Sequence, residues 1–276
     1  MGLIQIACQT YTWEMLGDAW HGRVTDILDW VAGTGYAGIE ITNRMIREYG
    51  DRPFDFAAEL RSRGLQLAAF AYSSASGFTH PDCWDEDVAG AQHVIQFLGH
   101  FPASRLALGG AATVSGAAHP SRDGARASLD QAIRFYNEIG RIAVAAGVPV
   151  NVHPHSHHGS LLESAQDYQY LMDRLDPAYA SLGPDTGHIV RGGQDLLACL
   201  RTYLPRITHL HLKDATAARE WVALGEGVCD FPAVMRLLES TGYQGWVVAE
   251  EESEAARHDG IEAIRKNRAY LRGIGY

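Results

Sequence analysis

Histidine is concentrated in one stretch of this chain, where several side chains could do chemistry together. Of 13 histidines, seven lie between positions 153 and 211. They are His153, His155, His157, His158, His188, His209 and His211. An imidazole binds divalent metals and exchanges protons near neutral pH, because its ordinary pKa is about 6.5. Two carboxylates in the same half of the chain, Asp185 and Glu250, offer oxygen atoms that can complete a metal site with these nitrogens.

Four of these side chains share one feature, since each comes at the end of a short apolar run. They are His153, Asp185, His211 and Glu250. Any one of them alone is more often a hydrogen-bonded structural residue, but four successive runs that end in this way indicate a shared site. Two imidazoles and two carboxylates suit Mn²⁺, Co²⁺, Zn²⁺ or Fe²⁺ better than Ca²⁺ and leave positions open for substrate oxygens. We therefore predict a catalytic metal site.

Eight short apolar or alternating runs, rich in Ile, Val, Leu and Tyr, are the elements that must position these residues. We predict strands at residues 3–10, 38–42, 65–72, 105–110, 149–153, 180–185, 207–213 and 246–250. The segments between them have helical spacing of apolar residues. This alternation predicts a parallel sheet with right-handed crossovers. Eight units favour a single (β/α)₈ TIM barrel over residues 1–276, and no G-x-G-x-x-G follows the first run to support a doubly wound sheet.

The barrel prediction narrows the search, because barrel active sites lie at the carboxyl ends of the strands. The two-residue alternation of a strand places His209, His211 and Lys213 on one face of the seventh run. We expect His209, the farthest of the three from the strand end, inside the barrel. Glu40 lies in the second run and is a candidate for binding substrate.

Composition and charge exclude several classes of protein. With 23 Lys and Arg against 33 Asp and Glu, the net charge is −10, which disfavours nucleic acid and anionic membranes as partners but is compatible with a neutral polyol. The four scattered cysteines include no C-x-x-C pair, so we expect a reducing compartment. No apolar run approaches the ~20 residues of a membrane helix, and the first residues do not resemble a signal peptide. We therefore predict a cytoplasmic protein.

At these residues the sequence resembles the xylose isomerase-like TIM-barrel superfamily, the sugar isomerase/epimerase and inosose dehydratase group. The matching stretches are residues 35–40, 185–188, 209–214, 225–231 and 242–250. The resemblance covers nearly the whole chain. It implies a divalent metal, commonly Mn²⁺ or Co²⁺, held at the ends of strands five to eight by Asp185, His211 and Glu250. Zn²⁺, Mg²⁺ and Fe²⁺ remain open.

The fifth strand departs from the epimerase pattern. Members that isomerise or epimerise ketoses usually have a glutamate there, which is a ligand and half of a carboxylate pair that moves protons. This chain has His153 instead, and the histidine-rich run 153–160 looks more like the inosose dehydratase branch. The resemblance therefore favours a lyase over an isomerase or epimerase.

The resemblance and the ligand set together predict an enzyme that removes the proton α to the carbonyl of a polyhydroxylated ketone. We assign Glu250 as base as well as ligand, His188 to proton transfer or support of the ligands, and Lys213 to stabilising a developing oxyanion. Acid assistance from His155 or Glu163 would release a β-hydroxyl and give dehydration. Reprotonation would give isomerisation or epimerisation instead.

The substrate-binding candidates are Glu40, His155, Glu163 and Trp13. For the histidines at 155, 157 and 158, exposure in a loop is an equal alternative, as is the core for Trp13. Barrels of this kind often associate, so a homo-oligomer is an open expectation.

Two readings from other classes remain. An endonuclease IV-like DNA-repair enzyme has a related metal-dependent fold, but it needs a basic face and further ligands on the early strands. Those strands end here in Thr10, Thr42, Tyr72 and Gly110, which offer few ligands. A non-catalytic metal or sugar binder would use the histidines of residues 153–158 as a chelating loop.

Overall fold

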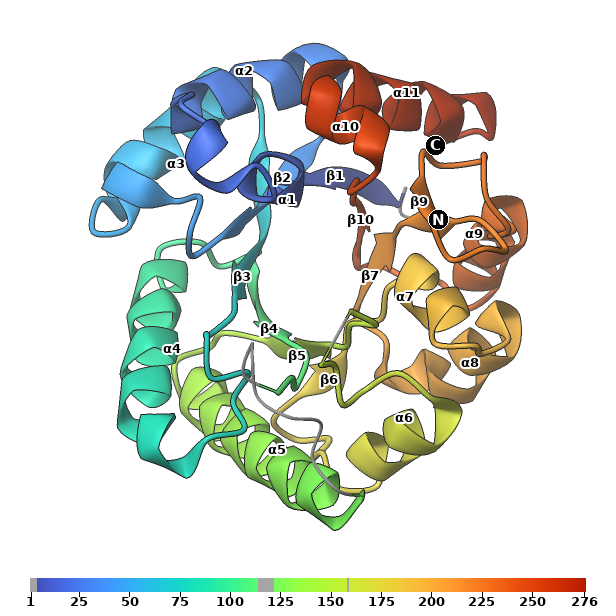
Figure 1. The fold of residues 1–276 in the computed structure, drawn as a ribbon. Coiled ribbons are helices and arrows are strands. Elements are labelled where there is room, and N and C mark those ends of the chain that lie inside the picture. The colour runs from blue at the N-terminus through green and yellow to red at the C-terminus, as the bar shows by residue number, and fades with distance from the viewer. Residues whose placement is uncertain (1–3, 114–121, 158) are drawn as a thin grey trace.

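The structure is a computed structural model that describes residues 4–113, 122–157 and 159–276. Within these residues, eight parallel strands form a ring surrounded by helices (Figure 1). The strands are β1 (Gln5–Gln9), β2 (Gly38–Thr42), β3 (Gln66–Tyr72), β4 (Arg105–Gly109), β5 (Val150–His153), β6 (Ser181–Leu182), β7 (His209–Leu212) and β10 (Trp246–Ala249). Each lies inside one of the eight predicted runs.

The strand order closes the ring. Neighbouring strands follow the order β6-β5-β4-β3-β2-β1-β10-β7, and β6 meets β7 through the parallel bridges Leu182↔Ile207 and Asp185↔His211. Every connection therefore joins parallel strands in chain order around the ring, which is the topology of a (β/α)₈ barrel. The predicted fold class is confirmed.

The helices cover the outside of the ring. They are α1 (Tyr11–Glu14), α2 (Val24–Thr34), α3 (Pro53–Ser62), α4 (Trp84–Leu98), α5 (Arg122–Ala145), α6 (Ala165–Met172), α7 (Thr186–Arg191), α8 (Leu196–Tyr203), α9 (Phe231–Ser240), α10 (Glu254–His258) and α11 (Gly260–Gly273). Short 3₁₀ turns lie at Gly17–Ala19, Arg47–Tyr49, Pro81–Cys83 and Leu204–Arg206. In the part of the chain that the structure describes, no helix is both long and apolar enough to span a membrane.

Helix α2 illustrates how the sequence specifies these helices. Its apolar residues recur at the three- and four-residue spacing that builds one buried face, and Val24, Leu28 and Val31 are fully buried on it. The helix ends at Gly35, whose φ of 87° is left-handed and favours glycine. The chain then turns directly into β2.

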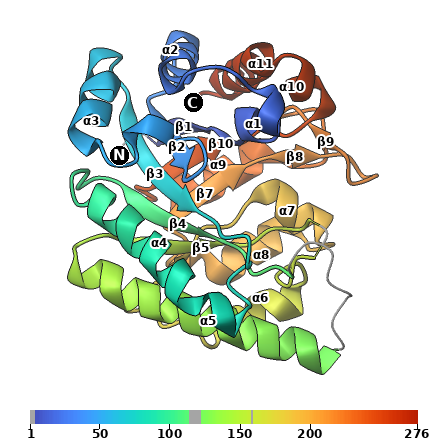
Figure 2. The same cartoon turned by 60° about the vertical axis from the view of Figure 1, so that its left-hand side comes forward.

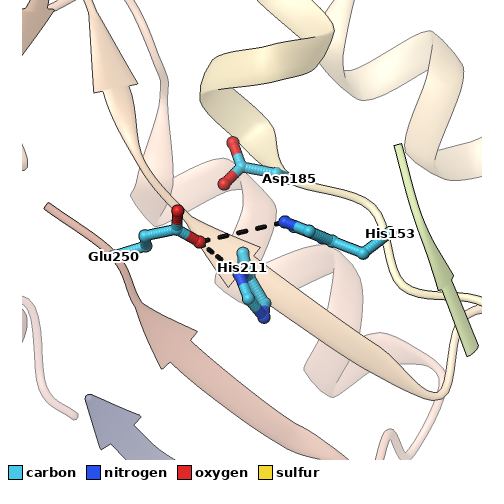
Figure 3. A group of neighbouring side chains, drawn as sticks. All are labelled: His153, Asp185, His211 and Glu250. Carbon is cyan, nitrogen blue, oxygen red and sulfur yellow. Dashed lines mark hydrogen bonds and ion pairs between the residues drawn. The ribbon is translucent and has the colours of Figure 1, made fainter. Parts of the chain in front are cut away.

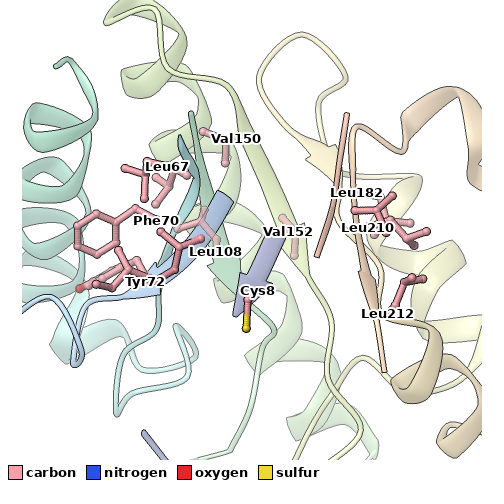
Figure 4. Close-up of a cluster of buried hydrophobic side chains, with 14 of the residues drawn as sticks. Cys8, Leu67, Phe70, Tyr72, Leu108, Val150, Val152, Leu182, Leu210 and Leu212 are labelled. Atoms are coloured by element: carbon pink, nitrogen blue, oxygen red, sulfur yellow. The ribbon is translucent and has the colours of Figure 1, made fainter. Parts of the chain in front are cut away.

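Alternation along the strands separates two packing layers. On β5 and β7 the apolar residues Val150, Val152, Leu210 and Leu212 belong to the large hydrophobic cluster shared by strands and helices (Figure 4). The residues between them face the barrel interior, where polar side chains lie beside a small separate apolar cluster that includes Val248. The interior is therefore the layer that can carry chemistry.

One element lies outside the predicted pattern. A short antiparallel hairpin, β8 (Asp214–Ala215) with β9 (Trp221–Val222), follows β7 directly and extends beyond the ring (Figure 2). The Asp214 carboxylate accepts hydrogen bonds from the backbone N–H groups of Gly225, Gly227 and Cys229. The glycine-containing stretch after the hairpin therefore wraps around a carboxylate rather than a phosphate.

Candidate active site

Four strand ends bring together the candidate ligands predicted from the sequence. His153 ends β5, Asp185 follows β6, His211 lies in β7 and Glu250 follows β10. One nitrogen or oxygen from each lies within 4.8 Å of those of the other three, and all four side chains are buried. Figure 3 shows them converging from separate strands on one point.

A backbone carbonyl fixes the orientation of His153. Its Nδ1 lies 2.9 Å from the carbonyl oxygen of Gly183, which can only accept, so Nδ1 carries the hydrogen. The lone pair is then on Nε2, which is buried without a hydrogen-bond partner and lies 3.9 Å from Glu250 Oε2. Burial lowers the pKa of His153 to about 3, so the ring is neutral, as a metal ligand must be.

A helix cap fixes Asp185. It is the N-cap of α7, and its Oδ1 accepts the backbone N–H of His188 at 2.9 Å. The second oxygen, Oδ2, is buried without a hydrogen-bond partner and faces Lys213 Nζ at 3.9 Å. Burial raises the pKa of Asp185 to about 6. One oxygen thus caps a helix while the other is left for a ligand.

His211 lies between two carboxylates. Its Nδ1 is 2.6 Å from Glu250 Oε2 and its Nε2 is 3.1 Å from Glu40 Oε2. Burial alone would lower the pKa of His211, but Glu40 and Glu250 outweigh it and raise that pKa to about 10. Both ring nitrogens are therefore donors to carboxylates in this structure.

The donor set fits a divalent cation. Buried polar atoms without partners are rare in proteins, and here His153 Nε2 and Asp185 Oδ2 are two such atoms in one group of four. A cation between them would satisfy both. Neutral imidazole and carboxylate are also the mixed nitrogen and oxygen donors that first-row divalent metals accept.

Lys213 and its partners form the charged border of the ligand group. Its Nζ donates to Glu250 Oε1 at 2.7 Å and also to Glu252. Burial would lower the pKa of Lys213, but Glu250, Glu252 and Asp185 outweigh it and raise that pKa, so the side chain stays an ammonium. Burial raises the pKa of Glu252 to about 7.

His188 presents a fixed donor beside Lys213. The backbone N–H of Ser156 donates to Nδ1 of His188 at 2.8 Å, so the neutral ring carries its hydrogen on Nε2. That nitrogen lies 3.2 Å from Lys213 Nζ. Burial, and after it the Lys213 charge, hold the pKa of His188 well below its ordinary value. The ring can therefore donate a hydrogen bond to a substrate oxygen while it stays neutral.

A cavity of about 590 Å³ opens above these residues. His153, His155, His188, Glu250 and Glu252 line one side of it. Small and uncharged residues at the end of β4 and in the loops after β3 and β4 also line it, among them Ser73, Ser74, Gly77, Gly109, Gly110 and Ala112. The volume is ample for a sugar-sized molecule.

Of the four residues predicted to bind substrate, one lines the described cavity wall and three do not. His155 lines the cavity, and its Nδ1 accepts the backbone N–H of Gly110 at 3.4 Å. The described part of the cavity wall does not include Glu40, Glu163 or Trp13. Trp13 is buried in the hydrophobic core and stacks on Trp30 at a ring separation of 5.7 Å. The structure therefore gives Trp13 a packing role.

Glu40 and Glu163 also lie apart from the cavity. Glu40 is completely buried inside the barrel, where it contacts His209 and His211. Glu163 is half-buried, and its backbone carbonyl accepts from the Gln194 side chain. Of the loop histidines, His157 also lines the cavity, whereas His158 lies outside the described residues.

Glu252 and Trp221 are among the cavity residues that the sequence did not predict. Glu252 follows Glu250 by two residues, so continuing the strand alternation past β10 would have found it. Trp221 lines the cavity from the hairpin and makes an edge contact with the His188 ring at 4.9 Å. Strand β9 has only two residues and therefore shows no alternation of apolar and polar residues, so the sequence pattern did not predict a role for Trp221.

Comparison with known proteins gives a consistent family of matches. Residues 28–274 match the family described as xylose isomerase-like TIM barrel. The chain is 34% identical over 161 residues to a protein named inosose dehydratase from Geobacillus thermodenitrificans, and 33% identical over 153 residues to one of the same name from Bacillus anthracis. These alignments cover 52% and 49% of this chain and 53% and 51% of the relatives. The chain thus spans about half the length of the curated relatives that it matches.

Solved structures share the fold at lower identity. The 3-keto-D-glucoside 4-epimerase of E. coli superposes with a TM-score of 0.77 at 17% identity, over 98% of this chain and 100% of that one. The IOLI protein, whose crystal structure contains a bound zinc atom, superposes with a TM-score of 0.79 at 14% identity, over 98% of both chains. At these identities the likeness establishes the fold alone.

Proposed function

The chain belongs to the xylose isomerase-like TIM-barrel family, and on this basis we propose that it is a divalent-metal-dependent enzyme that removes the proton α to the carbonyl of a keto-sugar or keto-inositol. The observation that carries the proposal is the convergence of two buried, unpartnered ligand atoms, His153 Nε2 and Asp185 Oδ2, in a group of four that borders a large cavity. The names of the relatives, inosose dehydratase and sugar epimerase, support the same substrate class.

His153, Asp185, His211 and Glu250 would hold the cation, with Mn²⁺ or Co²⁺ as the favoured ions. When bound, the cation supplies Lewis-acid polarisation of the substrate carbonyl and neutralises charge on the enediolate. The zinc atom in the IOLI structure supports a divalent ion in a barrel of this shape.

The other steps belong to residues of the chain. Glu250 takes the α-proton, because its carboxylate lies at the cavity and is held ionised by Lys213 and His211. Lys213 does not itself line the described cavity wall, but its ammonium contacts Glu250 and Glu252, which do, and from there it stabilises the negative charge that develops on the substrate oxygen. His188 donates the hydrogen on Nε2 to a second hydroxyl or carbonyl oxygen and so orients the ring or chain of the substrate.

The second half of the reaction is elimination in our preferred version, an inosose dehydratase-like lyase. The β carbon–oxygen bond breaks, a double bond forms between the α and β carbons, and the hydroxyl leaves as water after receiving a proton. Glu252 is placed to give that proton, since it lines the cavity and its pKa is raised to about 7. His155 also lines the cavity, but burial holds its pKa well below its ordinary value, so its neutral ring assists by donating a hydrogen bond to the departing hydroxyl. Glu163 does not line the described cavity, so we no longer assign it this role.

The alternative is isomerisation or epimerisation, in which the α-carbon is reprotonated and no hydroxyl is lost. Epimerases among the structural neighbours favour this version. His153 at the end of β5 argues against it, because a glutamate there usually supplies one half of the proton-moving pair in such enzymes. In that version the two carboxylates available for proton transfer within the ligand group would be Asp185 and Glu250.

One experiment separates these outcomes. Protein loaded with Mn²⁺ or Co²⁺ is incubated in D₂O with 2-keto-myo-inositol and with ketohexoses, and the products are followed by NMR. We expect loss of a hydroxyl and a new vinylic signal. Deuterium incorporated with every hydroxyl retained would establish the isomerase version. Tight metal binding without exchange or elimination on any ketone would contradict catalysis and leave a metal or sugar binder.

A further inference from the structure

Glu40 is a buried carboxylate that does not belong to the strands of the ligand group. That group comes from β5, β6, β7 and β10, whereas Glu40 lies in β2. It lies on the side of the ring opposite β6 and β7, and none of its surface is exposed. It is not part of the described cavity wall. A fully buried charge is costly unless it is paired, so its partners identify its role.

Three side chains hold the Glu40 carboxylate. Its Oε2 lies 2.6 Å from His209 Nε2 and 3.1 Å from His211 Nε2, and its Oε1 accepts from Gln9 Nε2 at 3.3 Å. A carboxylate anion only accepts hydrogen bonds, so Nε2 of both histidines must carry the hydrogen. The proton on His211 Nε2 is thus assigned by its surroundings.

That assignment decides which nitrogen of His211 can bind a cation. With the hydrogen held on Nε2, the lone pair of a neutral His211 can form only on Nδ1. Nδ1 is the nitrogen that faces Glu250 in the ligand group. Without an acceptor at position 40, the neutral ring could place its hydrogen on Nδ1 and block the site. Carboxylates that orient metal-binding histidines in this way are worth about 10- to 100-fold in metal affinity.

We propose that Glu40 is a positioning residue, which reaches across the barrel to keep His211 in its ligating tautomer, and that His209 holds Glu40 in place from the layer below. This inference rests on the metal centre of the proposed function. It also gives Glu40 a role other than the substrate binding predicted for it from the sequence.

A rival reading makes the same residues a second metal site, since Glu40, His209 and His211 also have ligand atoms within 4.8 Å of one another. The hydrogen-bond partners of the atoms in the two groups favour a positioning role for Glu40 over a second metal site. In the ligand group, His153 Nε2 and Asp185 Oδ2 lack partners, whereas in the Glu40 group the facing atoms are hydrogen-bonded to one another. A single carboxylate also provides little charge for a second cation.

The test measures metal binding, so it does not depend on knowing the substrate. Co²⁺ is titrated calorimetrically into the full-length wild type, Glu40→Gln and Glu40→Leu. Glutamine keeps an acceptor oxygen but loses the charge, so we expect its Kd to rise about 10-fold, and that of the leucine variant to rise further. Asp87→Asn is the matched control, because Asp87 is also a buried carboxylate, hydrogen-bonded to Ser76 and outside the Glu40 and ligand groups. Its Kd should equal that of the wild type.

A spectroscopic readout separates positioning from general destabilisation. In ¹⁵N-histidine-labelled protein loaded with Zn²⁺, the wild type should show His211 metal-bound at Nδ1 and strongly hydrogen-bonded at Nε2–H, with that proton far downfield. Glu40→Gln should move this proton upfield. Equal Kd values for Glu40→Gln and wild type would overturn the proposal, as would two cations per chain with the second lost in His209→Gln.

The outcomes also separate this inference from the proposed function. A wild type that takes up one Co²⁺ but neither exchanges nor dehydrates any ketone overturns only the proposed function. A wild type that takes up no Co²⁺ overturns both.

Discussion

The carboxyl ends of the strands form two halves that differ in the side chains they carry. In the ligand half, made of β5, β6, β7 and β10, the strand ends carry His153, Asp185, His211 and Glu250. In the wall half, made of β1 to β4 and the loops that follow them, the strands end in Gln9, Thr42, Tyr72 and Gly109. Both halves line one cavity. The comparison teaches that the chemically active side chains gather in one half, so that in the proposed function this half would carry the reaction while the other would shape the space around the substrate.

The halves also differ in how a change of side chain is absorbed. In the ligand half each buried charged side chain has a buried partner of opposite sign. Replacing one partner by a neutral residue therefore leaves the other charge buried and unpaired. In the wall half, small residues and glycines bring loop backbones close together, so added volume is what disrupts.

The largest effect should follow Asp185→Asn. Asparagine keeps the N-cap of α7 but replaces the free carboxylate oxygen by a neutral group, so we expect the metal content after dialysis to collapse and turnover to fall by about 10³-fold or more. Metal analysis and the D₂O assay measure both. Asp195→Asn is the matched control, because Asp195 is the exposed N-cap of α8 and accepts from Ala198 N at 2.7 Å. Wild-type metal content in Asp185→Asn would mean that the ligand half is not a metal site.

Lys213→Met should be the next largest, as a change in folding stability. Lys213 is almost completely buried, and its loss leaves Glu250 and Glu252 without their shared cation. We expect the free energy of unfolding of the metal-free protein to fall by about 3 to 4 kcal/mol at pH 8. Burial raises the pKa of Glu252 to about 7 even beside Lys213, and removing the ammonium raises it further. Glu252 of the variant therefore takes up a proton as the pH falls from 8 to 6, which relieves part of the loss. Urea unfolding at pH 8 and pH 6 measures it, and an equal loss at both would contradict the argument.

In the wall half, Gly77→Ala should destabilise the fold by about 2 to 3 kcal/mol. Gly77 has a φ of 59°, and a Cβ there would lie 2.1 Å from the backbone oxygen of Ala112. Gly64→Ala is the control, since Gly64 has a similar φ of 67° with nothing within 4 Å of its Cβ, and it should cost only about 1 kcal/mol. Urea unfolding of both variants isolates the clash from the backbone strain. Equal losses would show that the two wall loops can separate freely.

The sequence predicted where a residue lies around the ring better than how deep it lies along the barrel axis. The strand-end rule converts chain order into position around the ring, so His153 and Glu250 were placed together although 97 residues separate them. The rule does not give depth along the barrel axis, because tilted strands are staggered. Glu40 was therefore expected at the cavity but lies against His209 and His211 inside the barrel. For Trp13 the sequence left the cavity wall and the core equally open, and the short α1 turns it onto Trp30 in the core.

The pH dependence of metal binding should sharpen the description of the ligand half. His211 must lose the proton on Nδ1 to bind a cation, and its pKa in the metal-free protein is about 10. Raising the pH towards 10 therefore strengthens binding, and we expect the Kd for Co²⁺ to fall about tenfold per pH unit between pH 7 and 9. Below about pH 6 the slope should steepen, because Asp185 must also lose a proton. Calorimetry in buffers of different ionisation enthalpy should find about one proton released at pH 8. A Kd independent of pH would contradict this, and His258→Gln, at an exposed histidine, should keep the wild-type slope.

The smallest effect should come from Arg44→Gln, the wall-half counterpart of Lys213. Arg44 lines the cavity itself, whereas Lys213 contacts the lining residues Glu250 and Glu252. The Arg44 side chain is 61% exposed and its Nη1 lies 3.8 Å from Glu14 Oε1. Water screens such a pair, so the free energy of unfolding should change by about 0.5 kcal/mol or less. Since the wall half shapes the space and does not take part in proton transfer, KM should change by about twofold or less and kcat should stay the same. Steady-state kinetics with the ketone found in the D₂O screen measures both constants. A clear fall in the kcat of Arg44→Gln would break the comparison, because it would place part of the chemistry in the wall half.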